Sequence, residues 1–298
     1  MESTVITDKK KKIKIKPFRI IMFTILALWS ISFIYVLLWA LMSSLKSIGE
    51  FRLNKTSLLP KDWAFDNYVK VFKQYKIQIY GSSEYALFPL LLLNTFIYVV
   101  LSSVTTIVMP YLVAYCNVKF SYRFNKFIYG FVLVSMIIPV VGAQAATLKL
   151  LNRLHIYDTW LGLFVLKSGF LGIEFLIFHS AFRNIPKELS EAACVDGASE
   201  LRTLVQIILP QTLNICGVLF ITSSIGNWNN FMYTRIWMPK HPTLALALHE
   251  LSLSYNTGMS AVPMRLTACF ILIIPILTVF IIFKDKMMIS LNVGGVKE

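Results

Sequence analysis

Charged residues are scarce in this 298-residue chain: they make up only 15% of it, whereas hydrophobic residues make up 56%. Soluble globular domains carry about 25% charged residues, so the composition excludes an ordinary soluble enzyme. Acidic residues are the rarer kind, with 15 Asp and Glu against 29 Lys and Arg and a net charge of +14. The basic residues lie between and beside apolar runs, not on one folded face. This distribution indicates contact with lipid headgroups and argues against nucleic acid as a partner.

The sequence also lacks the motifs of nucleotide, metal and nucleophile chemistry. No G-x-x-x-x-G-K-[ST] segment is present to hold nucleotide phosphates, so any ATP must be bound by another protein. Neither H-E-x-x-H nor G-x-S-x-G occurs, and the four cysteines and four histidines lack the spacing of metal ligands or of a disulfide framework. We therefore expect no catalytic residue, no metal site and no cofactor in this chain.

The chain contains five long runs without any charged residue. They cover residues 20–45, 85–118, 127–148, 203–234 and 266–283. A run of about 18 or more such residues is typical of a helix that crosses a membrane. The sequence therefore predicts an all-α integral membrane protein. With about 20 residues for each crossing, six transmembrane helices are expected, at residues 20–44, 89–115, 126–148, 160–182, 209–233 and 266–284.

Basic residues indicate the orientation of these helices. Residues 1–19 carry seven Lys and Arg, and we expect this segment in the cytoplasm because both residues are enriched there. Six crossings within residues 20–284 then place the C-terminal tail, 285–298, in the cytoplasm as well. The long outer loop at 46–88 also contains many lysines and dilutes the bias, but the short inner loop from Lys119 to Lys126 agrees with it.

The segment 184–208, between the fourth and fifth predicted spans, is unlike its apolar surroundings. Pro186 suits a first helical position, Gly197 can take the left-handed conformation that ends a helix, and Ser199 can cap the next helix. The segment is therefore predicted to form a helix, a turn and a second helix on the cytoplasmic face.

The first of these two helices has the features of a docking surface. Ala192 and Ala193 place small side chains on it that can sit deep in a groove of a partner, while Glu191 offers a charge to a basic residue there. An amphipathic helix that touches only lipid headgroups is the alternative interpretation of the same residues.

One motif in this segment carries a family resemblance. Glu191-Ala192-Ala193-x-x-Asp196-Gly197-Ala198, followed by Leu209-Pro210, resembles the EAA loop of binding-protein-dependent ABC importer permeases. Other segments are similar to the carbohydrate branch of that family, of the maltose-permease second-subunit type. They are Asn67-Tyr68-x-x-Val71-Phe72, Asn94-Thr95, Met136 to Pro139, Asp158 to Leu163, Trp228 to Phe231, Pro242 to Ala245 and Gly294 to Lys297. Many relatives carry an acidic residue where this chain has Asn230.

The resemblance implies a type I ABC importer permease fold with both termini on the cytoplasmic side of a bacterial plasma membrane. It implies as partners a second homologous permease, two copies of a cytoplasmic ABC ATPase that bind ATP and Mg²⁺, and an extracytoplasmic sugar-binding protein. The implied function is ATP-driven uptake of a sugar or oligosaccharide by alternating access. Glu191 would then be the docking carboxylate, residues 196–198 would shape the turn that transmits ATPase closure, and Gly294, Gly295 and Val296 would reach between the ATPase subunits.

Polar and aromatic side chains inside the predicted spans are candidates for substrate contact, because sugars are bound by amides, hydroxyls and aromatic faces. The candidates are Asn94, Gln144, Glu174, Asn227, Trp228, Asn229, Asn230 and Tyr233. Interhelical hydrogen bonds are the alternative role for each. Lys167 and Glu174 are seven residues apart and are expected on one face of the fourth span. We expect Lys167 to extend to the outer surface and Glu174 to face the bundle interior or the partner permease.

Two other classes of function are weighed against the importer. A self-contained secondary transporter would need an inverted repeat or a coupling-ion site, and neither is evident in the sequence. A membrane-embedded enzyme would need a catalytic constellation, which is also missing. Other ABC branches share the EAA loop, so a permease for a solute other than a sugar remains an alternative.

Overall fold

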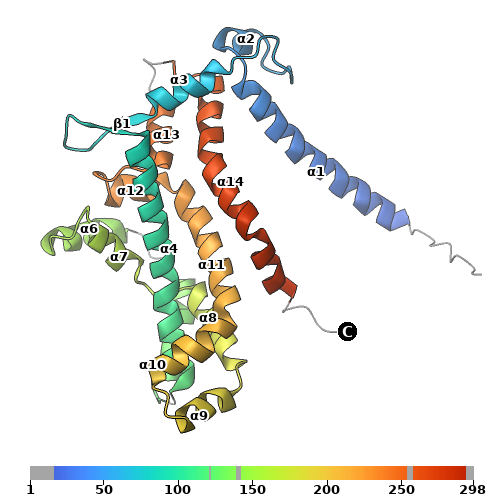
Figure 1. The fold of residues 1–298 in the computed structure, drawn as a ribbon. Coiled ribbons are helices and arrows are strands. Elements are labelled where there is room, and N and C mark those ends of the chain that lie inside the picture. Colours follow the sequence, from blue (N-terminus) through green and yellow to red (C-terminus); the bar gives the residue numbers. More distant parts are fainter. Residues whose placement is uncertain (1–16, 121, 139–141, 254–257, 293–298) are drawn as a thin grey trace, which may run out of the picture.

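The computed structural model describes residues 17–120, 122–138, 142–253 and 258–292. This part of the chain is mostly helical. Three helical stretches run along the long axis of the molecule: α4, Phe88–Lys119; α11, Leu209–Asn229; and α14, Val262–Asn292 (Figure 1). Helix α11 packs against both α4 and α14. Helix α1, Pro17–Ser44, contacts α14 near one end of the molecule and then diverges from the bundle.

Three helical stretches are long and apolar enough to cross a membrane: Pro17–Ser44, Phe88–Lys119 and Glu200–Asn229. The last begins with α10, Glu200–Thr203, passes through the π-helix η1, Leu204–Ile208, and continues as α11. Helix α11 begins at Leu209, as predicted for the fifth span at 209–233, although the helical stretch that contains it starts nine residues earlier. The predicted far end is wrong, because α11 stops at Asn229. Asn230 leaves the helical conformation with ψ 80° and precedes α12, Phe231–Trp237.

The predicted third span, 126–148, is not one helix. It consists of α5, Asn125–Ile137, and α6, Ala143–Arg153. The chain becomes extended at Ile138, with ψ 112°, as expected for a residue that precedes a proline. Gly142 then has φ +84°, in the left-handed region that favours glycine. Pro139 itself lies outside the described residues.

The predicted fourth span, 160–182, is also interrupted. Helix α7 covers Trp160–Lys167 and helix α8 covers Ile173–Arg183, with an irregular connection between them. Gly172 has an extended backbone, with φ −165° and ψ −178°. A spacing of seven residues therefore does not place Lys167 and Glu174 on one helical face, because the helix between them does not exist.

Short elements gather at one end of the bundle (Figure 1). They are α2, Ile48–Leu53; α3, Asp66–Gln74; α13, Leu244–Leu253; and the antiparallel strands β1, Lys76–Gln78, and β2, Tyr85–Leu87, with Ile77 opposite Ala86. A hydrophobic cluster that includes Val71, Tyr75 and Trp228 lies beneath them. We call this end the loop end.

Hydrogen bonds from Asn67 connect the elements of the loop end. Its Nδ2 donates to the carbonyls of Ser44, at 2.9 Å, and Lys46, at 2.8 Å. The hydroxyl of Thr267 on α14 donates to the same Ser44 carbonyl, at 3.0 Å. The end of α1, the start of α14 and α3 are thus held at one point, which gives the Asn67-Tyr68 motif a structural role.

The opposite end of the bundle, which we call the hairpin end, has its own aromatic core. Tyr111 of α4 packs edge-on against Phe178 and Phe182 of α8, with ring centroids 5.0 and 4.9 Å apart. Leu204 and Ile208 of η1 are buried in the same cluster. This core fixes α8 and η1 against α4, and it carries the helix–turn–helix segment at its outer surface.

Candidate functional site

The segment between α8 and α11 forms a helical hairpin, as predicted. Helix α9 covers Lys187–Val195 and is followed by α10. Gly197 has φ +77°, and the amide of Ala198 donates to the carbonyl of Ala193, at 2.9 Å, which closes the end of α9. Ser199 caps α10 by accepting a hydrogen bond from the Arg202 amide, at 3.3 Å. We call α9, the turn and α10 the α9–α10 hairpin.

Two faces of α9 differ in their surroundings. Ala193 is buried, and Ser190 is buried beside it, so this side holds the helix against the bundle. Val195 is 88% exposed on the side that points away, whereas Leu189, one turn before Ala193, is 41% exposed at the edge of the packed side. The hairpin therefore presents apolar side chains to its surroundings and has the form expected of a docking element.

The α9–α10 hairpin is joined rigidly to the rest of the bundle. Helix α10 continues through η1 into α11, with Leu209 and Pro210 in the first turn of α11, where a proline is tolerated. Thr212 shares a hydrogen bond with the Tyr111 hydroxyl, at 3.1 Å. The Glu200 carboxylate lies 3.8 Å from Lys119 Nζ at the end of α4. Movement of the hairpin would therefore move α11 with it.

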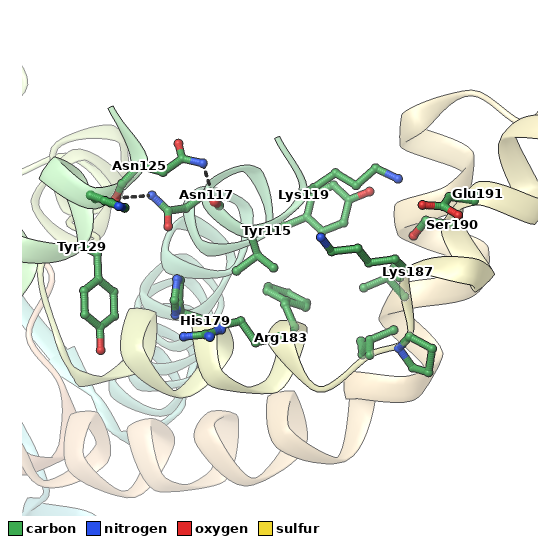
Figure 2. A pocket seen from close by; sticks show the side chains of 16 residues that line it. Tyr115, Asn117, Lys119, Asn125, Tyr129, His179, Arg183, Lys187, Ser190 and Glu191 are labelled. Atoms are coloured by element: carbon green, nitrogen blue, oxygen red, sulfur yellow. Dashed lines mark hydrogen bonds between the residues drawn. The ribbon is translucent and has the colours of Figure 1, made fainter. Parts of the chain in front are cut away.

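A pocket of about 890 Å³ opens next to the hairpin, between the ends of α4, α5, α8 and α9 (Figure 2). Its ionisable Lys, Arg and Glu side chains are Lys119, Lys126, Arg183, Lys187 and Glu191. Glu191 is exposed and stands with Ser190 on the α9 side of the pocket (Figure 2). We call this cavity the basic pocket, because four of the five side chains are cationic.

A polar cluster surrounds Asn227 in the last turn of α11, toward the loop end. Asn227 is 8% exposed. Its Nδ2 donates to Ser103 Oγ, at 3.3 Å, and to Ser223 Oγ, at 3.2 Å. Its Oδ1 accepts from Lys167 Nζ, at 3.2 Å, and from the Tyr98 hydroxyl, at 3.5 Å. Side chains from α4, α7 and α11 therefore converge here, and we call them the Asn227 cluster.

The expected extension of Lys167 to the outer surface is wrong. Its ammonium group instead bonds Asn227 and lies 4.0 Å from the centroid of the Tyr233 ring. The amide oxygen and the aromatic face compensate the partly buried charge within reach of the side chain. Tyr98 and Ser103 complete the cluster but were not among the predicted residues, because a single tyrosine or serine in an apolar run carries no pattern of its own.

Most other predicted pathway residues make hydrogen bonds within the fold. Asn94 Nδ2 donates to the carbonyl of Pro242, at 3.1 Å, and Trp228 Nε1 donates to the carbonyl of Leu272, at 3.2 Å. Asn230 Oδ1 accepts from the amide of Tyr233, at 3.0 Å, and caps α12. Asn229 is exposed and bonds only a carbonyl of its own helix, that of Ile225. Asn94, Trp228 and Asn230 thus position segments of the fold, and none of these four residues is among those that line the basic pocket.

Two further candidates lie on short helices away from the cluster. Gln144 is exposed in the first turn of α6. Glu174 is half-buried in the first turn of α8, where its carboxylate folds back over Gly172: a Cβ at that glycine would lie 2.7 Å from Glu174 Oε2. Its orientation toward a partner subunit stays a prediction. Gly294, Gly295 and Val296 lie outside the described residues.

A family of known proteins matches most of the chain. The model of the family described as "Binding-protein-dependent transport system inner membrane component" matches residues 106–286. These residues include the α9–α10 hairpin, the basic pocket and the greater part of the Asn227 cluster.

Individual relatives extend over nearly the whole sequence. The diacetylchitobiose uptake system permease protein NgcG of Streptomyces coelicolor is 27% identical over 284 residues, 94% of this chain and 89% of the relative. The arabinooligosaccharides transport system permease protein AraQ of Bacillus subtilis is 24% identical over 285 residues, 94% of this chain and 96% of the relative.

A solved structure has a similar fold. A chain from the crystal structure of a bacterial ABC transporter involved in the import of the acidic polysaccharide alginate superposes with a TM-score of 0.72 at 19% identity. The superposition covers 95% of this chain and 99% of that one. The chain therefore shares its overall fold with a chain of that transporter.

Proposed function

Because the chain belongs to the family of binding-protein-dependent transport system inner membrane components, we propose that it is the permease subunit of an ATP-driven importer of a sugar or oligosaccharide. The names of its relatives support this substrate class, since NgcG and AraQ are permeases of systems that take up oligosaccharides. The chain itself is a transport subunit, not an enzyme.

The α9–α10 hairpin is the proposed site of coupling to a separate ATPase. The observation that carries this proposal is the continuous helical stretch from Glu200 to Asn229. It spans about 45 Å at about 1.5 Å per residue, and it connects the hairpin at one end with Asn227 near the other. A displacement imposed on the hairpin by ATPase closure would thereby reach the Asn227 cluster as a rigid-body movement.

The complete importer requires partners that we infer from the family. We propose two copies of a cytoplasmic ATPase that bind ATP and Mg²⁺, a second permease subunit, and an extracytoplasmic sugar-binding protein, assembled in a bacterial plasma membrane. A structure similar to this chain, with a TM-score of 0.61, contains an alginate pentasaccharide-bound periplasmic protein together with the transporter. The loop end would then face the binding protein, and the hairpin end the ATPase.

Charge reversal at Glu191 tests the coupling role. Affinity purification of the tagged chain from native membranes identifies the binding protein, whose ligand can be determined by screening and then used as the labelled transport substrate. Glu191→Lys is expected to reduce uptake to background while the protein accumulates normally in the membrane, because the exposed carboxylate would no longer pair with a basic residue of the ATPase. Glu84→Lys makes the same charge change at the exposed β-hairpin of the loop end and should retain most of the uptake.

Normal uptake by Glu191→Lys would remove Glu191 from the coupling surface. Purification of the chain without an ATPase, combined with transport by the isolated chain after reconstitution, would contradict the importer itself. The first result tests the role of Glu191 and the second tests the assignment as an importer subunit, so the two failures can be distinguished.

A further inference from the structure

A second pocket, of about 750 Å³, lies beside the β1–β2 hairpin at the loop end. Its volume falls in the range of about 300–1,000 Å³ that is usual for small-ligand pockets. Aromatic and planar polar side chains share its wall: Tyr80, Tyr85, Tyr157, Gln78, Arg235 and Glu250. We call this cavity the tyrosine pocket. Neither the residues around the basic pocket nor those of the Asn227 cluster line it.

The antiparallel ribbon of β1 and β2 supplies one side of the tyrosine pocket. Gln78 is paired with Tyr85 across the ribbon, so both side chains project from the same face, and Lys76 projects from it two residues away. Lys76 Nζ accordingly lies 5.0 Å from the centroid of the Tyr85 ring. Ala86, on the opposite face, is fully buried in the hydrophobic cluster of the loop end. The buried face anchors the ribbon and leaves the polar face accessible.

Helices α12 and α13 and the turn before α7 supply the other side. Leu246 and Glu250 line the pocket from one side of α13, four residues apart. Arg235 of α12 pairs with Glu250, with Nη1 2.8 Å from Oε1. The Tyr157 hydroxyl donates to the carbonyl of Ile236, at 2.9 Å. These contacts join the three segments, so the wall does not have to be assembled by a ligand.

The charges of the wall favour an uncharged ligand. Lys76, Arg235 and Glu250 are the Lys, Arg, Asp and Glu residues that line the tyrosine pocket, and Arg235 and Glu250 neutralise each other. A carboxylate or phosphate would find Lys76 as its cation. That side chain is exposed to solvent, where a single ion pair contributes little to binding.

The remaining features match a ligand that has many hydroxyl groups and apolar ring faces. Arg235 donates hydrogen bonds, whereas the side-chain oxygens of Glu250 and Gln78 accept them, and a hydroxyl group can do both. Tyr80 is 70% exposed and Tyr85 is 53% exposed, so their rings offer open aromatic faces. The C–H face of a sugar ring packs on such an aromatic face while its hydroxyls bond the polar groups around it.

The same wall is poorly suited to the centre of a protein interface. Charged residues are depleted at the centre of such interfaces. In the tyrosine pocket, the side chains of the Arg235–Glu250 pair are 48% and 37% exposed and face the space that a partner would have to fill. A saccharide keeps bonds to these groups, whereas an apolar protein anchor would remove them from water.

We propose that the tyrosine pocket binds an uncharged saccharide, with a sugar ring against Tyr80 or Tyr85 and its hydroxyls bonded to Arg235, Glu250 and Gln78. The site rests on the proposed function, because an importer whose binding protein docks at the loop end releases its sugar there. It goes beyond that function in assigning a saccharide subsite to this chain and in restricting the subsite to uncharged sugars.

Protection of the two exposed tyrosines from chemical modification tests this binding at the site itself. The purified complex, freed of the binding protein, is iodinated with a small reagent in the presence of millimolar arabinotriose, galactotriose or diacetylchitobiose. Peptide mass spectrometry follows each tyrosine. At saturation with at least one of these saccharides, Tyr80 and Tyr85 should react several-fold more slowly, and trigalacturonate should protect them less. Tyr122, which is 65% exposed and precedes α5 at the hairpin end, should react at an unchanged rate.

Variants connect the protection to the polar wall. Arg235→Ala/Glu250→Ala removes the ion pair as a unit, leaves no unpaired charge and should abolish the protection of both tyrosines. Glu84→Ala removes an exposed carboxylate from the same β-hairpin but not from the pocket, and it should keep the protection. If the double variant does not assemble, Gln78→Ala carries the test, because its side chain is exposed.

Three results would overturn the saccharide subsite. They are unchanged iodination of Tyr80 and Tyr85 with every saccharide, protection that survives in the double variant, and protection by the binding protein alone but not by a saccharide. The last result would identify the pocket as a protein-docking surface. Copurification of the ATPase and ATP-driven uptake are measured separately, so failure of the subsite and failure of the importer assignment can be distinguished.

Discussion

Asn227 uses its amide group more fully than any other predicted pathway residue. The four hydrogen bonds that it forms connect α4 and α7 to α11 and leave no part of the amide free for water. Asn229 lies two residues further on, is exposed and bonds one carbonyl of its own helix. A comparison of alanine variants at these two positions therefore measures how much the buried hydrogen bonds of Asn227 contribute to stability.

Replacement of Asn227 by alanine should destabilise the assembled protein. Buried polar partners that lose a hydrogen bond cost about 1–3 kcal/mol, and Lys167 would also lose the oxygen that holds its ammonium group. Thermal unfolding of the purified complex in detergent should show a Tm several degrees lower for Asn227→Ala and nearly unchanged for Asn229→Ala. Equal melting temperatures for the two variants would mean that the Asn227 cluster contributes nothing to stability.

The sequence identified the polar residues inside apolar runs as candidates for interhelical or substrate contacts. It could not show which of these residues contact one another. Asn94 bonds Pro242, and the Thr95 hydroxyl accepts from the Leu244 amide, at 2.9 Å. The motif Asn94-Thr95 and the motif that begins at Pro242 therefore contact each other, although they are almost 150 residues apart in the chain. Composition and spacing report local tendencies, whereas such a pairing depends on how α4 and α13 pack.

At the scale of elements, the α9–α10 hairpin depends on its turn. Gly197 has φ +77°, and the Ala198 amide closes α9 from the following position. A left-handed conformation costs a residue with a side chain about 1–2 kcal/mol, so Gly197 sets the angle between the two helices. This part of the site was predictable, because capping residues act through neighbours in the chain.

Gly197→Ala should weaken coupling more than it weakens folding. Strain at the turn would tilt α9 relative to α10, so we expect uptake and binding-protein-stimulated ATP hydrolysis to fall several-fold while the complex still assembles. Gly49→Ala is a suitable comparison, because Gly49 lies in α2 with no atom within 4 Å of an added Cβ and should leave both activities unchanged. Full activity of Gly197→Ala would show that the hairpin tolerates a different turn.

The helix breaks were not predictable from hydropathy. Residues 160–182 are apolar enough to suggest one span, yet the chain leaves the helical conformation between Lys167 and Ile173. Gly169 and Gly172 lie in this break, but neither has the positive φ that requires glycine, and glycine is also common in unbroken membrane helices. Whether a glycine interrupts a helix is decided by neighbouring helices that satisfy the freed backbone groups, and these neighbours are far away in the sequence.

At the scale of the whole molecule, helix α1 leaves most of its apolar surface uncovered. Helix α1 contacts the bundle through α14, and its most apolar window has no buried residue. Phe23 is 74% exposed and Trp29 is 60% exposed. Surfaces of this kind are stable only against lipid or another membrane subunit, which agrees with a permease that works within a larger assembly.

The two ends of the molecule should lie on opposite sides of the membrane. The hairpin end carries Cys194 on α9 in an exposed position, and the loop end carries the exposed Ser83 in the β-hairpin. In a chain whose other cysteines are replaced by serine, Cys194 should resist a membrane-impermeant maleimide in spheroplasts. It should react in inverted vesicles from which urea has removed peripheral proteins. A chain with Ser83→Cys as its one cysteine should show the reverse pattern. Labelling of both positions from one side would contradict the orientation on which the proposed placement of the ATPase depends, and the bias of Lys and Arg would then have misled the assignment.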